Sequence, residues 1–222
     1  MPDALAEIDG LEVAFAGHDG ALTPAVRGVS LTVRRGERLG IVGESGSGKS
    51  MTGRALLGLL PPEAKWSAQA LRFEGQDLLA MRPKERRRLC GTCISMILQD
   101  PKYSLNPVMT VAQQMRETFA RQGAKQSRRE IRERIVAALE AVHIRDPERV
   151  ADAYPHELSG GMGQRVMIAM MVSAGPRLLI ADEPTSALDV LVSMQVLSVL
   201  DEMIERHGTA RASFSSATIC RS

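Results

Sequence analysis

The residues of this chain that are best suited to chemistry form a glycine-rich loop that ends in a lysine and a serine. In order, the loop reads Gly43, Glu44, Ser45, Gly46, Ser47, Gly48, Lys49 and Ser50. The glycines allow the backbone to wrap around a phosphate group so that successive N–H groups point inward. The ammonium of Lys49 supplies charge for the β- and γ-phosphates, and the hydroxyl of Ser50 can ligate Mg²⁺. The pattern therefore predicts a phosphate-binding loop of the Walker A type.

Two carboxylates supply a second part of such a site. Asp182 and Glu183 follow directly after the apolar run 178–181, which has the continuous hydrophobicity of a buried parallel strand. At the end of that strand, Asp182 can hold Mg²⁺ and Glu183 can polarise a water molecule as a general base. Taken alone, the string is also compatible with a strand that ends in solvent. Its place after a phosphate-binding loop favours the catalytic interpretation.

The elements next to the loop are those that a Walker A motif requires. Residues 39–42 form a short apolar strand that runs directly into Gly43, and residues 51–60 read as a helix that is stopped by two prolines. Towards the N-terminus, alternating patterns indicate hairpin strands at 7–15, 29–33 and 68–80. We therefore expect an antiparallel β subdomain ahead of a core that carries the loop.

The stretch from 100 to 157 has a helical character. Ser127 and Glu130 form a capping box, and one apolar helix face follows it, made of Ile131, Ile135, Leu139 and Val142. Further helices are expected at 162–173 and 190–206. The sequence thus predicts an α/β fold, namely a P-loop NTPase core with a mainly parallel sheet, an N-terminal antiparallel β subdomain and an inserted helical subdomain.

Composition excludes several classes of function. The net charge of +2 is too small to indicate a polyanion partner, and 3% aromatic residues provide no stacking platform for nucleic acid. The N-terminus lacks the apolar segment of a secretion signal, and the longest apolar run, 166–172, is too short to cross a bilayer. We expect a soluble, cytoplasmic protein. Cys90 and Cys93 have the spacing of a redox or zinc pair, but their context favours simple packing.

The run Glu157-Leu158-Ser159-Gly160-Gly161-Met162-Gly163-Gln164-Arg165 narrows the class of protein. With the loop at 43–50 before it and the acidic pair after it, this order resembles the nucleotide-binding subunits of ABC transporters. The resemblance implies an ATPase that uses ATP and Mg²⁺ and couples hydrolysis to transport. It also implies that Ser159, Gly160 and Gly161 bind the ATP of a second ABC ATPase subunit, so that two ATP molecules lie within a head-to-tail dimer.

Other site residues follow from the same resemblance. Gln99 corresponds to the Q-loop glutamine, which contacts Mg²⁺ and the attacking water. Ser186 and Asp189 belong to the D-loop, which crosses the dimer interface. Phe15 stands where the adenine-stacking aromatic usually falls, although packing in the core is an equal alternative. Met162 replaces a frequent glutamine, and we expect little effect because the phosphate contacts come from the serine and the backbone.

Two stretches, 99–110 and 154–162, look like those of the dipeptide, oligopeptide and nickel importer ATPases. This likeness covers about residues 5–208 and implies transmembrane permease subunits, an extracytoplasmic substrate-binding protein as an indirect partner, no nucleic acid, and a place on the cytoplasmic face of the membrane. The expected organisation is a single domain, 1–222, with a core and β subdomain at 5–99 and 166–208, a helical signature subdomain at 100–165 and an aberrant tail at 209–222.

The tail departs from the family pattern, which continues with an apolar strand and a switch histidine. No histidine follows His207 in this sequence. With serines taken as TCN codons and the frame shifted by two bases, residues 213–216 become Phe, Leu, Ile or Val, and 217–220 permit Ser-His-Asp-Leu. We hypothesise a frameshift between about Ala210 and Ala212, which would remove a sheet strand and the switch histidine. A coincidental tail is the alternative, and the gene sequence decides between them.

Three functions thus compete. The first is an energy-coupling ATPase for the import of peptides or nickel. The second is a soluble ABC ATPase that acts on DNA or ribosomes, which would need coiled-coil insertions or two fused cassettes. The third is a catalytically impaired remnant that binds nucleotide without turning it over.

Overall fold

A computed structural model describes residues 4–17, 20–98, 105–120, 126–182, 198 and 210–216. By its internal contacts the chain divides into two compact units. Unit 1 comprises residues 1–90, 180–182 and 210–222, and unit 2 comprises residues 91–179 and 183–209. The boundary between them passes inside strand β8 (Leu178–Asp182). The predicted subdomain boundaries at 99/100 and 165/166 stay a prediction.

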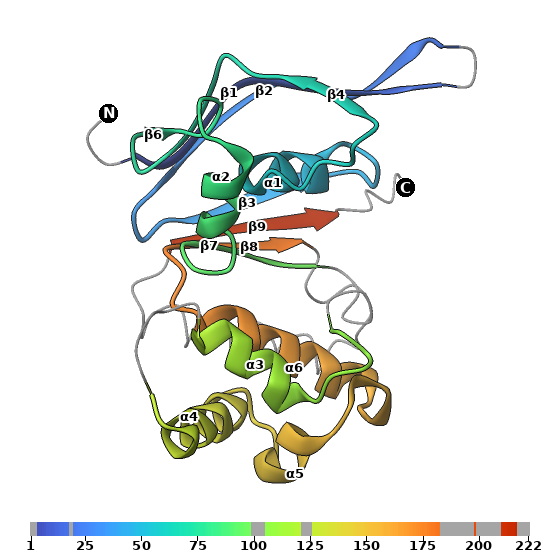
Figure 1. The fold of residues 1–222 in the computed structure, drawn as a ribbon. Helices are drawn as coiled ribbons and strands as arrows, with labels where there is room; N and C mark the ends of the chain where they lie inside the picture. Colours follow the sequence, from blue (N-terminus) through green and yellow to red (C-terminus); the bar gives the residue numbers. More distant parts are fainter. Residues whose placement is uncertain are drawn as a thin grey trace. The chain divides into compact units, whose positions relative to one another are not determined.

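An antiparallel sheet forms the N-terminal part of unit 1 (Figure 1). Its strands are β1 (Ala4–Ala16), β2 (Leu22–Arg34), β4 (Ala64–Ser67), β5 (Ala70–Phe73) and β6 (Gln76–Asp77). They lie in the order β2-β1-β5-β6, and β4 also pairs with β1. Ala6 and Ile8 alternate on one face of β1, and after a shift in register Leu11 and Val13 do the same; all four are at most 1% exposed, so this face buries apolar surface as a half-covered sheet does. The three predicted hairpin regions are confirmed.

A second, parallel sheet in unit 1 carries the loop. Strand β3 (Arg38–Gly43) runs into the loop, and helix α1 (Lys49–Leu57) follows it, as predicted. β3 pairs in parallel with β9 (Ala210–Ser216), and β8 is the next strand in the order. Figure 1 shows β3 and β9 side by side. Helix α2 (Pro83–Leu89) completes this unit.

The expectation that the tail leaves the sheet without a strand is wrong. Residues 210–216 pair with β3 over its whole length, from Arg38 opposite Arg211 to Gly43 opposite Ser216. The reason is physical: a parallel ladder is made by backbone N–H and C=O groups, which every residue other than proline supplies. Small side chains therefore do not prevent a strand where a neighbouring edge offers unpaired backbone groups.

Unit 2 consists of helices with one short strand. Its elements are β7 (Ile94–Ile97), α3 (Val111–Ala120), α4 (Arg128–Ala141), α5 (Pro147–Asp152), a 3₁₀ turn at Pro155–Glu157 and α6 (Gly160–Ser173). The predicted capping box is present, because Ser127 Oγ accepts from the Glu130 N–H at 3.2 Å and the Glu130 carboxylate accepts from the Ser127 N–H. Ile135, Leu139 and Val142 are at most 1% exposed, which confirms the predicted apolar face.

The core of unit 2 is built around α6. Met167 is fully buried and Met170 is 8% exposed, while Met162 and Met171 pack against the same cluster. The prediction that these methionines pack in the core is confirmed. Among the described residues, no helix is both long and apolar enough to cross a membrane.

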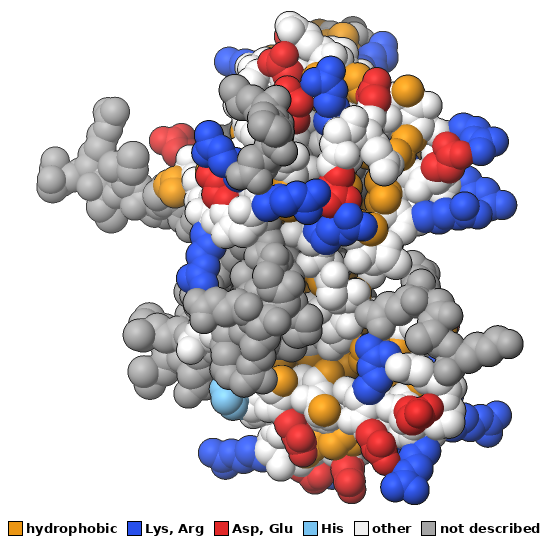
Figure 2. Space-filling view, turned by 90° about the vertical axis from the view of Figure 1, so that its left-hand side faces the viewer, with side chains coloured by type: hydrophobic (Ala, Val, Ile, Leu, Met, Phe, Trp, Pro, Cys, Tyr) orange, Lys and Arg blue, Asp and Glu red, His pale blue; other side chains and the backbone are white. Residues whose placement is uncertain are grey.

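The surface carries charges of both signs. On the face drawn in Figure 2, Lys and Arg side chains lie among Asp and Glu side chains, with smaller hydrophobic areas between them. Several of these charges are paired. Arg132, for example, binds the carboxylate of Asp152 through both terminal nitrogens, at 2.6 and 2.8 Å, and this pairing lowers the pKa of the Asp152 carboxyl group.

Gln114 gives a test of how unit 2 is held together. This side chain, 8% exposed, accepts from the Asn106 N–H at 2.8 Å and donates to the carbonyls of Asn106 and Met109 at 3.1 and 3.0 Å. Gln114→Leu keeps the volume but leaves these backbone groups unpaired, so we expect the free energy of unfolding to fall by about 2–3 kcal/mol. Gln113→Leu, at an exposed position, should cost less than about 1 kcal/mol. Equal losses in urea unfolding would contradict this account.

Candidate functional site

The glycine-rich loop depends on a close approach between Gly48 and strand β2. Gly48 has a φ of 90°, which L-residues with side chains rarely adopt. A Cβ atom at this position would lie 2.3 Å from the Ala25 carbonyl oxygen and 2.8 Å from Val26 Cγ2. Only glycine fits, and the backbone of β2 therefore fixes where the loop turns into α1.

The Lys49 side chain folds back onto the loop and binds its backbone carbonyls. Its side chain is 9% exposed, and its ammonium donates to the carbonyls of Gly43 at 2.8 Å and Glu44 at 2.7 Å. The Ser47 hydroxyl lies 3.4 Å from the same nitrogen. The charge is therefore held at the centre of a ring of loop atoms by hydrogen bonds that offset its desolvation.

Ser50 and Asp182 meet beside this ring. Ser50 is in the first turn of α1, and Asp182 is the last residue of β8. The Ser50 hydroxyl donates to Asp182 Oδ1 at 2.8 Å, and Asp182 is only 5% exposed. Residues 132 positions apart in the sequence are thus brought within one hydrogen bond. A hydroxyl and a carboxylate oxygen at this distance suit Mg²⁺, which binds few protein oxygens and keeps other positions for water and phosphate.

The structure therefore brings Lys49, Ser50 and Asp182 together at the end of the loop, and their role in binding phosphate and metal stays a prediction. The backbone N–H groups at the start of α1 add partial positive charge next to these residues. The exposed loop residues Glu44 to Ser47 leave one side of the ring open to solvent. The arrangement can hold an anion such as a polyphosphate with a divalent cation beside it.

The Ser-Gly-Gly run, residues 159–161, lies at the start of helix α6 in unit 2. Ser159 is its N-cap, and the Ser159 hydroxyl accepts from the Met162 N–H at 3.4 Å. Gly160 has open space where a Cβ would be. Ser159 and Gly161 line a pocket of about 420 Å³ together with Arg145, Asp146, Arg149 and Arg165, which come from the α4–α5 connection, α5 and α6. Arg149 is paired with the Asp146 carboxylate at 3.1 Å, so Arg145 and Arg165 supply the positive charge of this pocket that Asp146 does not offset.

Sequence reasoning missed these cationic residues. Arg145 and Arg149 flank the start of α5, where the Asp146 side chain caps the helix by accepting from the Arg149 N–H at 3.4 Å. Arg165 donates to the His143 carbonyl at 3.1 Å. Arg165 belongs to the run 157–165, but no motif marks Arg145 and Arg149, which lie beside Ser159 only because α4, α5 and α6 pack together.

Of the other predicted site residues, Phe15 lies within the described part of the chain. Phe15 is half-buried in β1, where its register partners are Thr23 of β2 and Ala64 of β4, so adenine stacking and core packing both stay open. Four predicted residues lie outside the described part of the chain, and their roles stay predictions: Gln99, Glu183, Ser186 and Asp189. Cys90 and Cys93 are both free thiols, and the Cys90 thiol donates to the Leu57 carbonyl at 3.2 Å.

The sequence of this chain is similar to those of known proteins. The family model described as "ABC transporter" matches residues 26–186. The dipeptide transport ATP-binding protein DppD of Escherichia coli is 47% identical over 208 residues, which cover 93% of this chain and 63% of that protein. The oligopeptide transport ATP-binding protein OppD of Bacillus subtilis is 43% identical over 207 residues, covering 93% of this chain and 57% of that protein. The chain thus spans about three fifths of the length of these curated relatives.

Solved structures share the fold. A dimeric ATP-binding cassette, MJ0796, in a post-hydrolysis state bound to ADP and Pi, superposes with a TM-score of 0.81 at 24% identity, over 95% of this chain and 87% of that one. The structure of cbiO1 from Clostridium perfringens, part of the ABC transporter complex cbiONQ, has a TM-score of 0.73 at 28% identity, over 97% of this chain and 79% of that one. The predicted fold class is confirmed.

Two glycines of the loop separate backbone strain from steric contact. Gly46 and Gly48 both have positive φ, at 81° and 90°, but a Cβ at Gly46 would meet nothing within 4 Å. Gly46→Ala should lower the free energy of unfolding by about 1–2 kcal/mol through φ alone. Gly48→Ala should cost about 1–3 kcal/mol more, because the β2 backbone must shift. Unfolding in urea without nucleotide measures both, and equal costs would show that the Ala25 contact is unimportant.

Proposed function

Because the chain belongs to the ABC transporter family, we propose that it is an ATP-binding subunit that hydrolyses ATP to drive the import of peptides or nickel through partner permease subunits. The observation that carries this proposal is the 2.8 Å hydrogen bond between Ser50 and Asp182, next to a lysine that is held inside the phosphate loop. These groups are the ones that a Mg²⁺–ATP site needs.

The residues of the loop would act on the phosphates in three ways. The loop N–H groups and the start of α1 bind phosphate oxygens, and Lys49 turns from the loop carbonyls to the β- and γ-phosphates. Ser50 and Asp182 would hold Mg²⁺, and Gln99 would contact the same ion. The ion would neutralise phosphate charge.

Glu183 is the proposed general base. It follows Asp182 directly, and successive side chains alternate between the faces of a strand, so the two carboxylates can serve different groups. Glu183 would accept a proton from the water that attacks the γ-phosphate, with Gln99 orienting that water. Phe15 is a proposed contact of the adenine.

The signature residues would complete the site of a second subunit. Ser159 and the N–H groups at the start of α6 would bind a γ-phosphate, and Arg145 and Arg165 in the same pocket support this proposal by their charge. Since each chain already has its own phosphate loop, we propose a head-to-tail dimer, with Ser186 and Asp189 in the interface. MJ0796, whose cassette has this fold, is a dimer.

The transported substrate and the place of action rest on the relatives. DppD is a dipeptide and OppD an oligopeptide transport protein, which favours peptides over nickel for this chain. We propose that the subunit acts at the cytoplasmic face of the membrane, bound to permease subunits, and that an extracytoplasmic substrate-binding protein delivers the substrate to them.

A second candidate is a catalytically impaired form of the same subunit. The specific observation is the composition of residues 213–220, whose shifted reading permits the switch segment with its histidine. Strand β9 forms in this chain nevertheless, so the proposed deficit concerns the histidine rather than the sheet. Loss of one such group would reduce turnover by about 10²–10³. If no single-base change in the gene restores a frame through Ser-His-Asp, this candidate fails.

Asp182→Asn tests the metal site. Asparagine keeps the size but loses the charge, so ATP turnover should fall by at least about 10²-fold and Mg²⁺ should no longer tighten ATP binding. Asp77→Asn is the matched control, because Asp77 is exposed and its Oδ1 accepts from the Leu79 N–H at 2.8 Å, a bond that asparagine retains. Equal turnover of the two variants would refute the assignment of Asp182.

Glu183→Gln tests the general base. The glutamine cannot accept the proton, so hydrolysis should fall by about 10²–10⁴ while ATP stays bound. Phosphate release and ATP binding are measured on the same preparation. Unchanged turnover would remove Glu183 from this role, and wild-type binding without turnover would favour the impaired candidate.

A further inference from the structure

The C-terminal end of helix α1 is closed by side chains of the α2 region. Gly58, with a φ of 66°, ends the helix, and the N–H groups of Gly58 and Leu59 donate to the carbonyls of Ala55 and Arg54 at 3.1 and 2.9 Å. Carbonyls of the last turn, Ala55 among them, also accept from a side chain outside the helix. Arg86 Nη2 donates to the Ala55 carbonyl and approaches the Leu56 carbonyl at 3.4 Å.

Arg86 is fixed from several sides. Its guanidinium lies over the ring of Trp66, 5.7 Å from the ring centroid. A Cβ at Gly58 would lie 3.0 Å from Arg86 Nε, so the glycine provides the space that the guanidinium occupies. Arg86 Nε is buried and has no hydrogen-bond partner within the described part of the chain, and burial lowers the pKa of this guanidinium. The carbonyls and the partial negative charge at the C-terminal end of α1 stabilise the partly desolvated guanidinium of Arg86.

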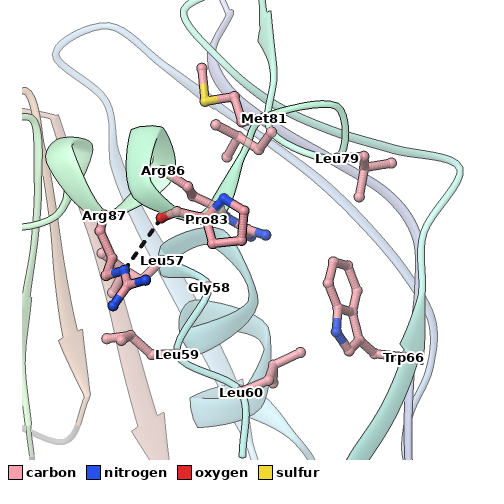
Figure 3. A pocket seen from close by; sticks show the side chains of 11 residues that line it. Leu57, Gly58, Leu59, Leu60, Trp66, Leu79, Met81, Pro83, Arg86 and Arg87 are labelled. Carbon is pink, nitrogen blue, oxygen red and sulfur yellow. Dashed lines mark hydrogen bonds between the residues drawn. The ribbon is translucent and has the colours of Figure 1, made fainter. Parts of the chain in front are cut away.

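Arg86 and Trp66 also line an open pocket of about 590 Å³ (Figure 3). Most of its other walls are apolar: Leu57, Leu59, Leu60, Leu78, Leu79, Met81 and Pro83. Arg87, the neighbour of Arg86, also lines the pocket but is exposed, and among the described residues its one printed hydrogen bond goes to the Pro83 carbonyl of its own helix, at 3.5 Å. Arg86, in contrast, is partly buried and contacts both Trp66 and the end of α1.

Helix α1 links this pocket to the phosphate loop. It has nine residues and is roughly 14 Å long, with Lys49 and Ser50 at one end and the Arg86 contacts at the other. A short helix with both ends bonded moves as one body, so its position at the phosphate end depends on what holds the opposite end. The charge of Arg86 also complements the partial negative charge of the helix C-terminus.

We infer that Arg86 is a positioning residue for nucleotide binding. It holds α1 in the position in which Lys49 and Ser50 can contact the phosphates. This inference rests on the proposed function of the loop. It has a reciprocal consequence: nucleotide that binds at the N-terminal end of α1 changes the contact between Arg86 and Trp66, because coupling between two sites acts in both directions.

The chain offers a direct reporter, because Trp66 is its only tryptophan. The whole chain is titrated with MgATP, and binding is followed both by equilibrium dialysis and by tryptophan fluorescence. We expect the fluorescence to change and to saturate at the same MgATP concentration as binding. Saturable binding without a fluorescence change would overturn the coupling. Absence of binding would contradict the proposed function itself, and the inference with it.

Variants separate positioning from mere stability. Arg86→Met should weaken MgATP binding roughly 5-fold or more and abolish the fluorescence response. Arg86→Lys, which can still donate to the helix-end carbonyls, should restore part of the affinity. Arg87→Met should bind as the wild type does. If Arg86→Met lowers the melting temperature but leaves the affinity within twofold of wild type, Arg86 is only structural and the inference is wrong. Where Arg86→Met does not fold, the fluorescence titration of the unmodified chain decides, and saturable binding without a fluorescence change overturns the inference.

Discussion

The close approach of Gly48 to the Ala25 carbonyl is the constraint on which the site depends. It fixes the point where β3 and its loop turn into α1. That turn places the Lys49 ammonium among the loop carbonyls and the Ser50 hydroxyl against Asp182. A glycine costs conformational entropy on folding. Here that cost is offset because the turn brings the polar groups of the loop together around one candidate binding site. Each group that would bind phosphate or metal is positioned by backbone contacts rather than by side-chain packing alone.

The fold and much of the site could be predicted because their signals are local. The loop motif lies between a strand and a helix in the sequence itself, and the apolar strand before Asp182 reads as buried, as it is. The capping box at Ser127 gave the start of α4 directly. These features depend on residues within a few positions of each other, where spacing determines geometry.

The parts that could not be predicted depend on tertiary contacts. The seven residues of β9 form a strand because β3 offers a backbone edge to them, which no property of an Ala- and Ser-rich stretch announces. Arg145 and Arg149 reach the pocket beside Ser159 only through the packing of α5. Arg86 lies in a basic run, 84–88, whose composition is typical of a solvated helix face and does not indicate the contacts that Arg86 makes with α1. Long-range positioning of charged side chains leaves no periodic trace in the sequence.

The central proposal is that the phosphate loop, Ser50 and Asp182 together form one Mg²⁺–ATP site. The most direct measurement is equilibrium binding of ATP to the unmodified chain, with Mg²⁺ and with a chelator. The structure predicts saturable binding of about one ATP per chain that Mg²⁺ makes tighter. Absence of saturable binding, or an affinity that is the same with and without Mg²⁺, would contradict it.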